Sequence, residues 1–221
     1  PFPSVGCVPV LYAPLPSVAP LPSVVPVLYA PSQVFTYNFP MPNYRRLHEG
    51  IAYFFTVVTY NRLPVFNNEK SIQILQAFWK IVEERFPFTT FAICILPDHI
   101  HTIWTLPEND QNYSVRWKGI KYQFTKRYLA EFGSGETRNL SRQKRGEAAI
   151  WQRRFWEHNI MDDGDLARHI DYIHFNPVKH GLVAEPGEWQ WSSFHRFVED
   201  GHYGPEWRLT GSDGGKAEYG E

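Results

Sequence analysis

The sequence predicts an α+β fold, a ferredoxin-like sandwich in which one antiparallel sheet is flanked by helices. Segments rich in aromatic and β-branched residues alternate with segments whose apolar residues recur at helical spacing, in the order β-α-β-β-α-β-α. The 221 residues suffice for one ordinary domain and an appendage. Apolar residues make up 43% of the chain and aromatic residues 16%, which excludes a chain that is disordered throughout.

Four strands are expected from their aromatic and β-branched residues. They are residues 53–60, 88–96, 99–106 and 150–156. The second and third are separated only by a turn-prone Pro-Asp pair, which indicates an antiparallel pairing. The fourth follows a polar, basic stretch at 133–147, which we expect to be a mobile loop.

Three helices are expected between and after these strands. The first starts from an asparagine cap at 67–68 and stops at Pro87. The second covers about 114–132, with aromatic residues on one side and lysines and arginines on the other. The third is introduced by acidic residues at 162–165 and ends at Pro177.

Charge is segregated along the chain, although the formal net charge is only -1. Residues 1–44 carry no charged side chain, residues 113–154 have eleven basic and three acidic ones, and residues 155–221 have five basic and thirteen acidic ones. The basic stretch is interleaved with aromatic residues, which is typical of a surface that binds nucleic acid. A solvated helix and loop is the alternative.

Residues 1–40 differ in composition from the rest. They hold ten of the eighteen prolines and repeat the segment Val-Pro-Val-Leu-Tyr-Ala-Pro, which predicts polyproline II structure or disorder. The first methionine is Met41, so we expect the natural protein to start there and the preceding tract to be upstream sequence read in frame. A proline-rich docking peptide is the alternative.

Several classes of protein are excluded by composition. No apolar run reaches the roughly 18–20 residues of a membrane-spanning helix. Cys7 and Cys94 are too few for a disulfide framework or a four-thiolate zinc site, and they fit a reducing cytosol. The glycine-containing acidic end at 208–221 is expected to be a flexible tail.

His99 and His101 form the first candidate site. A strand turns alternate residues to the same face, so both imidazoles share one face and Ile100 points into the core. Their Cα atoms would lie about 6.5–7 Å apart, close enough for both rings to converge on one metal ion. Two solvated histidines are the alternative interpretation.

Tyr172 and Asn176 form the second. Residues four apart share one face of a helix, and His169 joins that face. A core-edge tyrosine and an asparagine that stops the helix are the alternative. Together with His99 and His101, this face could complete a metal site, adding an oxygen ligand and a nucleophile.

Five segments of the chain are distinctive. They are Met-Pro-Asn-Tyr-Arg-Arg at 41–46, Tyr-Phe-Phe-Thr-Val-Val-Thr-Tyr-Asn-Arg at 53–62, Leu-Pro-Asp-His-Ile-His-Thr-Ile-Trp at 96–104, Ile-Trp-Gln-Arg-Arg-Phe-Trp-Glu-His at 150–158 and Asp-Tyr-Ile-His-Phe-Asn-Pro-Val-Lys-His-Gly-Leu-Val at 171–183. In these segments the chain resembles the REP-associated tyrosine transposases, single-strand transposases of the HUH endonuclease superfamily. The resemblance covers residues 41–207, which it identifies as a single-strand DNA transposase domain with the HUH endonuclease plan.

The resemblance implies an activity and its residues. His99, His101 and Asn176 would bind Mg²⁺ or Mn²⁺, and Tyr172 would be the nucleophile that nicks single-stranded hairpin DNA, forms a 5′-phosphotyrosine and rejoins strands. No ATP or other nucleotide cofactor is needed. The expected location is the bacterial cytoplasm at the nucleoid, without a membrane partner, as a monomer or a homodimer.

Basic residues near the aromatic side chains are the candidate contacts to DNA phosphates. They are Lys118, Lys121, Lys126, Arg127, Arg153, Arg154 and Lys179. Two other functions stay open. One is a nucleic-acid-binding module with a ferredoxin-like fold that cuts nothing, and the other is a metal-dependent nickase of the replication-initiator type.

Overall fold

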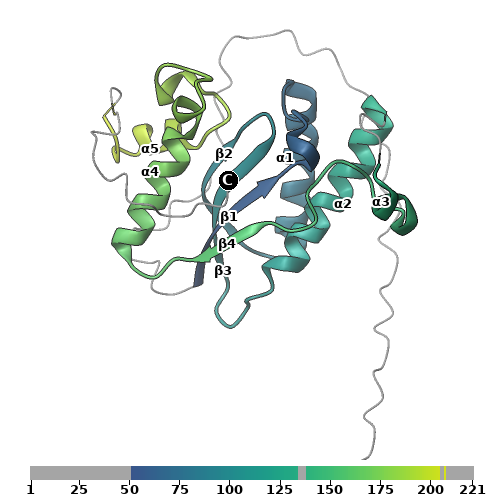
Figure 1. The fold of residues 1–221 in the computed structure, drawn as a ribbon. Helices are drawn as coiled ribbons and strands as arrows, with labels where there is room; N and C mark the ends of the chain where they lie inside the picture. The colour runs from purple at the N-terminus through teal and green to yellow at the C-terminus, as the bar shows by residue number, and fades with distance from the viewer. Residues whose placement is uncertain (1–50, 134–137, 205–206, 208–221) are drawn as a thin grey trace, which may run out of the picture. The chain divides into compact units, whose positions relative to one another are not determined.

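The computed structural model describes residues 51–133, 138–204 and Trp207 (Figure 1). They belong to one compact unit, Val34–Glu221. The expectations for residues 1–40, for Met41 and for the tail at 208–221 concern positions outside the described residues. Among the described helices, none combines the length and the apolar character needed to cross a membrane.

One four-stranded antiparallel sheet forms the centre of the domain. Its strands are β1 (Ile51–Val58), β2 (Thr89–Ile95), β3 (His99–Leu106) and β4 (Trp156–Asn159). They lie in the order β2-β3-β1-β4, and every neighbouring pair is antiparallel. This order, with β1 and β3 in the middle, confirms the expected α+β fold and ferredoxin-like plan.

Helices cover both faces of the sheet, as Figure 1 shows. The helices are α1 (Glu69–Arg85), α2 (Tyr113–Phe132), α3 (Leu140–Arg145), α4 (Asp163–Lys179) and α5 (Phe194–Glu199), with short 3₁₀ turns at Tyr60–Arg62 and Pro186–Glu188. The helices α1 and α2 pack against each other on one face, whereas α4 packs on β2 and β3 from the other.

The long helices begin at side-chain caps. The Oδ1 atom of Asn68 accepts a hydrogen bond from the Ser71 N–H at the start of α1, 2.9 Å away. Asn112 caps α2 in the same way, and Asp162 caps α4. The expected asparagine cap at 67–68 is therefore confirmed as Asn68.

Three expectations about secondary structure are wrong. Residues 150–156 do not form a strand: Trp151 makes only an isolated bridge with Thr59, and the strand starts at Trp156. Part of the expected loop at 133–147 is the helix α3, which an Asn139 cap begins. The helix α4 does not end at Pro177, which lies inside its last turn.

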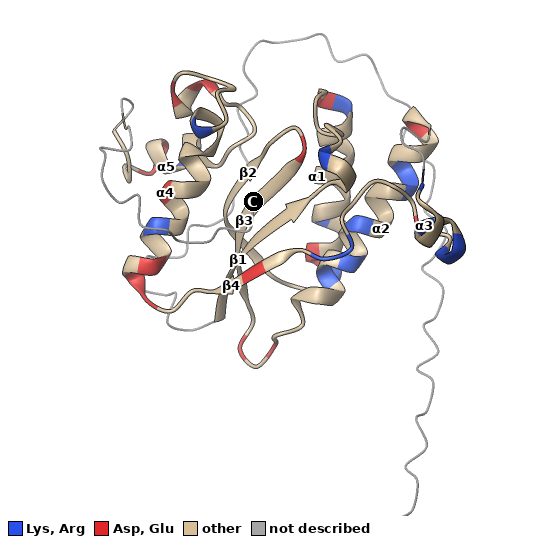
Figure 2. Ribbon diagram, in the orientation of Figure 1, with Lys and Arg blue, Asp and Glu red and all other residues tan. Residues whose placement is uncertain are grey.

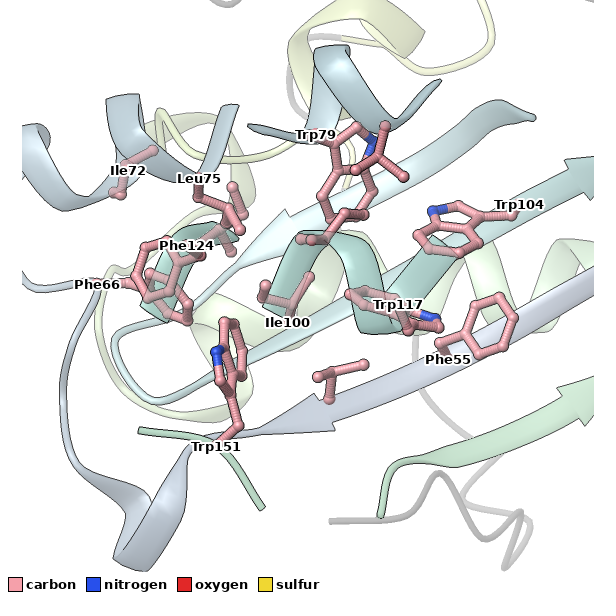
Figure 3. Close-up of a cluster of buried hydrophobic side chains, with 14 of the residues drawn as sticks. Phe55, Phe66, Ile72, Leu75, Trp79, Ile100, Trp104, Trp117, Phe124 and Trp151 are labelled. Atoms are coloured by element: carbon pink, nitrogen blue, oxygen red, sulfur yellow. The ribbon is translucent and has the colours of Figure 1, made fainter. Parts of the chain in front are cut away.

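Two buried clusters fill the spaces on either side of the sheet. The larger one, between the sheet and α1 and α2, is aromatic: the Trp104 and Trp117 rings stack 4.4 Å apart, and Trp79 meets both edge-on (Figure 3). The smaller one lies under α4 and α5. Ile100 belongs to the larger cluster, so the neighbouring His99 and His101 face α4, as the strand alternation predicts.

Candidate active site

His99 and His101 lie side by side on β3, beneath α4. Their ring centroids are 4.8 Å apart and the ring planes are nearly perpendicular. His99 is 1% exposed and His101 is fully buried, so the alternative of two solvated histidines is wrong. Two imidazoles that are buried together need polar partners, because burying a polar ring without them is costly.

A carboxylate orients His99. The Asp98 Oδ1 atom lies 2.5 Å from Nδ1 of His99, and Arg62 pairs with the other carboxylate oxygen at 3.3 Å. Burial opposes ionisation of Asp98, but the hydrogen bond and charge of His99 and the charge of Arg62 outweigh it and hold the pKa below its usual value. In a neutral His99 ring, Nδ1–H donates to the Asp98 carboxylate and Nε2 keeps its lone pair.

Each of the two imidazoles has one ring nitrogen held by the protein. The buried Nε2 atom of His99 makes no hydrogen bond to any described residue. Nδ1 of His101 lies 2.9 Å from the hydroxyl of Thr56, the residue opposite it on β1. Metal-binding histidines characteristically use one ring nitrogen for the ion and hydrogen-bond the other to the protein.

The helix α4 crosses both histidines. The Tyr172 ring lies 5.2 Å from the His101 ring, and the ring of His180, the residue that caps the end of α4, lies 5.1 Å from the His99 ring. Asn176 is four residues from each, on the same helix face, and is fully buried. Along the chain, Asn176 therefore lies midway between the two residues whose rings meet the imidazoles.

Two further side chains hold Tyr172. The Lys179 ammonium donates to its phenol oxygen across 3.3 Å and lies 4.8 Å from its ring centroid. Phe54 on β1 contacts both partners of the site: its ring stacks on His101 at 5.6 Å and meets the Tyr172 ring edge-on at 6.1 Å. The buried Phe54 ring thus contacts both His101 on β3 and Tyr172 on α4.

His169 lies on the same side of α4 as Tyr172, because both rings pack on Phe54, and it also belongs to a second cluster at the start of α4. Atoms of His158, Asp165 and His169 lie within 4.8 Å of one another. The two imidazoles are stacked nearly parallel, at 14°, so their in-plane lone pairs do not converge on one point. The Asp165 carboxylate instead accepts from Nε2 of His158 at 2.7 Å and from the Met161 N–H at 3.0 Å, which ties α4 to β4.

Six of the seven predicted DNA contacts lie on the opposite face of the sheet, along α2 and near residues 153–154, as Figure 2 shows for the basic residues. Most of them border an open groove of about 770 Å³ between α2 and residues 146–155. Lys118, Lys126 and Arg154 are exposed. Tyr122, one of the aromatic residues interleaved in the basic stretch, also borders the groove and is 60% exposed.

The remaining three predicted DNA contacts also interact with residues of the protein. The Lys121 ammonium donates to the Gln152 carbonyl at 2.9 Å, and burial, with the charge of a neighbouring arginine, lowers the pKa of Lys121 to about 8. Arg153 pairs with Glu147 at 2.7 Å. Arg127 pairs with Glu131 one turn along α2, at 3.3 Å.

Comparison with known proteins identifies the family. The family model described as "Transposase IS200 like" matches residues 48–176, more than half of the chain. The chain belongs to the IS200-like transposase family. A REP-associated tyrosine transposase of Escherichia coli is 40% identical over 168 residues, covering 76% of this chain and 91% of that protein. A Haemophilus influenzae relative, named provisionally as the same enzyme, is 48% identical over 168 residues, covering 76% and 93%.

A solved structure of an IS200-like transposase agrees in sequence and in fold. It is described as a REP-associated tyrosine transposase bound to a REP hairpin, is 38% identical and has a TM-score of 0.62. The match covers 78% of this chain and 92% of that one. This chain is therefore a transposase enzyme, and its family generally uses a divalent metal ion.

Proposed function

We propose that this transposase nicks and rejoins single-stranded hairpin DNA, with Tyr172 as nucleophile and with His99, His101 and Asn176 as ligands of Mg²⁺ or Mn²⁺. One observation carries the proposal: the helix α4 sets a phenol against His101, with Asn176 one turn further along. A structural role alone does not account for a buried, oriented imidazole whose second nitrogen makes no hydrogen bond to a described residue.

The chemistry follows from the groups that α4 presents. The Tyr172 oxygen attacks a DNA phosphate, the bond from phosphorus to the 3′-oxygen breaks, and the products are a 5′-phosphotyrosine and a free 3′-hydroxyl. The new phosphotyrosine is again a diester, so a second 3′-hydroxyl can displace Tyr172 and join new ends without ATP. A buried carboxamide and two oriented imidazoles would hold the divalent ion.

A bound divalent ion supplies charge neutralisation and polarisation of the phosphate. Two imidazoles and one carboxamide would hold the ion, and the phosphate of the DNA would lie beside it. Asp98 and Thr56 fix the two rings before DNA arrives, because each holds one Nδ1 atom. The protein residues therefore need little rearrangement when the ion binds.

The groove beside α2 offers a surface for the rest of the DNA. Lys118 and Lys126 in the groove and the exposed Arg154 would neutralise phosphates, and the exposed ring of Tyr122 would stack on a base. The chain passes from the groove to the active-site face at the edge of the sheet. Phe155 packs against the larger cluster, next to α2, and Trp156 packs against the smaller cluster, under α4. A hairpin held in the groove could therefore deliver a single strand around β4 to Tyr172. The E. coli and H. influenzae relatives and the hairpin-bound structure support this choice of substrate.

A covalent adduct tests the nucleophile. The full chain, incubated with a labelled single-stranded hairpin and Mg²⁺, is expected to give a protease-sensitive adduct that migrates more slowly than the free oligonucleotide. Tyr172→Phe should bind the hairpin and give neither product nor adduct. Tyr128→Phe is the matched control, because Tyr128 packs on Phe124 away from the site.

Three results would contradict the proposal, and two of them would favour another function. Cleavage by Tyr172→Phe would refute the proposed nucleophile. A product with a 5′-phosphate and no attached protein would favour a metal-dependent nickase. Hairpin binding without cleavage by the unmodified protein, at any Mg²⁺ or Mn²⁺ concentration, would favour a binding module.

Metal binding is measured separately from activity. Titration of the DNA-free protein with Mn²⁺, followed by electron paramagnetic resonance, should show one site, and His99→Ala should weaken it at least tenfold. An unchanged affinity in His99→Ala would contradict the ligand assignment, whatever happens to the cleavage rate.

A further inference from the structure

The last turn of α4 places the ammonium group of Lys179 beside the phenol oxygen of Tyr172. Lys179 is seven residues after Tyr172, two helical turns along the same face. Its Nζ atom lies 3.3 Å from the phenol oxygen and 4.8 Å from the ring centroid. The sequence suggests only a DNA-phosphate contact for this lysine, whereas the structure places it on the atom that attacks.

We infer that Lys179 is a catalytic residue, which stabilises the negative charge of the Tyr172 oxygen during cleavage and again during rejoining. The inference rests on the proposed role of Tyr172 as nucleophile. In the forward step the phenol oxygen bonds to phosphorus, the phosphorus–3′-oxygen bond breaks, the phenol proton passes to water and the 3′-oxygen takes a proton from water. Lys179 keeps its own protons throughout.

The length of the contact explains why it would accelerate the reaction. A distance of 3.3 Å is at the long limit of an N–H···O hydrogen bond, so the lysine gains little from the neutral phenol. Bonds from an ammonium to an anionic oxygen shorten to about 2.7–2.9 Å. The contact therefore strengthens as the oxygen gains charge, and only an interaction that is stronger in the transition state raises the rate.

The same argument applies to the rejoining reaction. When a 3′-hydroxyl displaces Tyr172 from the phosphotyrosine, the phenol oxygen is the leaving group and again carries negative charge. Lys179 should therefore accelerate cleavage and rejoining alike, because both reactions pass through the same transition state. A lysine that only contacts DNA phosphate would instead contribute to affinity.

The test separates rate from affinity. Lys179→Met removes the charge and keeps most of the length of the side chain. At saturating hairpin DNA its single-turnover cleavage rate is expected to fall roughly 10- to 100-fold, the range for loss of a hydrogen bond to a charged group. Its isolated adduct should rejoin to a 3′-hydroxyl strand more slowly by a similar factor. Lys179→Arg should recover the rate to within a few-fold, because guanidinium restores a charged donor.

One control variant and two contrary results make the outcome decisive. Lys80→Met, an exposed position on α1, should match the unmodified protein in rate and affinity. A saturated rate in Lys179→Met equal to that of the unmodified protein, with weaker binding and a salt slope smaller by about 1, would overturn the inference in favour of a phosphate contact. Cleavage by Tyr172→Phe would instead refute the proposed function, so the two failures are distinct.

Discussion

His174 should make the stability of this transposase depend on pH through a single buried side chain. It lies on α4, 1% exposed, on the side of the helix that packs against α5. Its Nε2 atom is 2.8 Å from the Ser193 hydroxyl, and Nδ1 is 3.3 Å from the Tyr203 hydroxyl, which donates to Asp171. Burial, together with two basic neighbours on α5, lowers the pKa of His174 to about 3.

The direction and size of the effect follow from proton linkage. In the unfolded chain a histidine has a pKa of about 6.5. Below that pH the side chain binds a proton in the unfolded state, whereas the buried His174 of the folded state stays neutral. The stabilisation is therefore fully present above pH 6.5 and is lost progressively as the pH falls toward 3. Between pH 7 and pH 5 the loss from this side chain is about 2 kcal/mol.

Urea unfolding of the full chain at both pH values measures this loss. His174→Gln, which does not titrate, is expected to be less stable than the unmodified protein at pH 7 and to lose about 2 kcal/mol less on going to pH 5. His169, whose pKa burial also lowers, contributes equally to both proteins and cancels in the comparison. Identical pH dependence in the two proteins would refute the reasoning.

Three other predictions concern the groove, the helix pair and the start of α4. Lys126→Ala should weaken hairpin binding and reduce the slope of log K against log salt by about 1, which fluorescence anisotropy at several salt concentrations measures; an unchanged slope would remove Lys126 from the DNA surface. A Cβ at Gly119 would lie 3.1 Å from Val82, so Gly119→Leu should destabilise the fold by about 1–3 kcal/mol in urea, and undiminished stability would contradict close contact between α1 and α2. Asp165→Asn should lower stability by about 1–3 kcal/mol through loss of the charge-assisted bond from His158, again measured in urea, and a neutral result would mean that this bond does not tie α4 to β4.

Local patterns predict the parts of the fold that local interactions determine. The first strand and the cap at Asn68 are correct because composition and capping act over a few residues. The stretch at 150–156 has a strand composition, but Trp151 packs on Phe66 and Phe124 instead of continuing in the sheet. Tertiary packing overrides propensity there, and no local signal reports it.

The sequence does not predict the helix α3, for another reason. Its six residues are almost all polar, so they carry no hydrophobic period. What holds it is the buried guanidinium of Arg142, which donates to the carbonyls of Ala148 and Trp151 at 2.6 and 2.8 Å. An arginine in a basic run looks like a solvated or DNA-binding residue, and only the folded chain shows that this one is structural.

Local patterns also predict only part of the candidate site. The alternation of a strand is enough to place His99 and His101 on one face, and helical spacing is enough to align Tyr172 with Asn176. The groups that orient them depend on long-range register. Thr56 reaches His101 only because β1 and β3 pair antiparallel with these residues opposite each other.

The one local rule that fails inside the site is informative. A residue before proline is disfavoured in a helix, so Asn176 followed by Pro177 predicts a helix end. The helix instead continues to Lys179 and closes with the His180 N–H on the Asn176 carbonyl at 3.0 Å. An end at Asn176 would remove Lys179 from the phenol oxygen and His180 from His99. Proteins tend to depart from local sequence rules at functional sites. The departure here is at Asn176, the proposed metal ligand, and it keeps Lys179 and His180 next to the site.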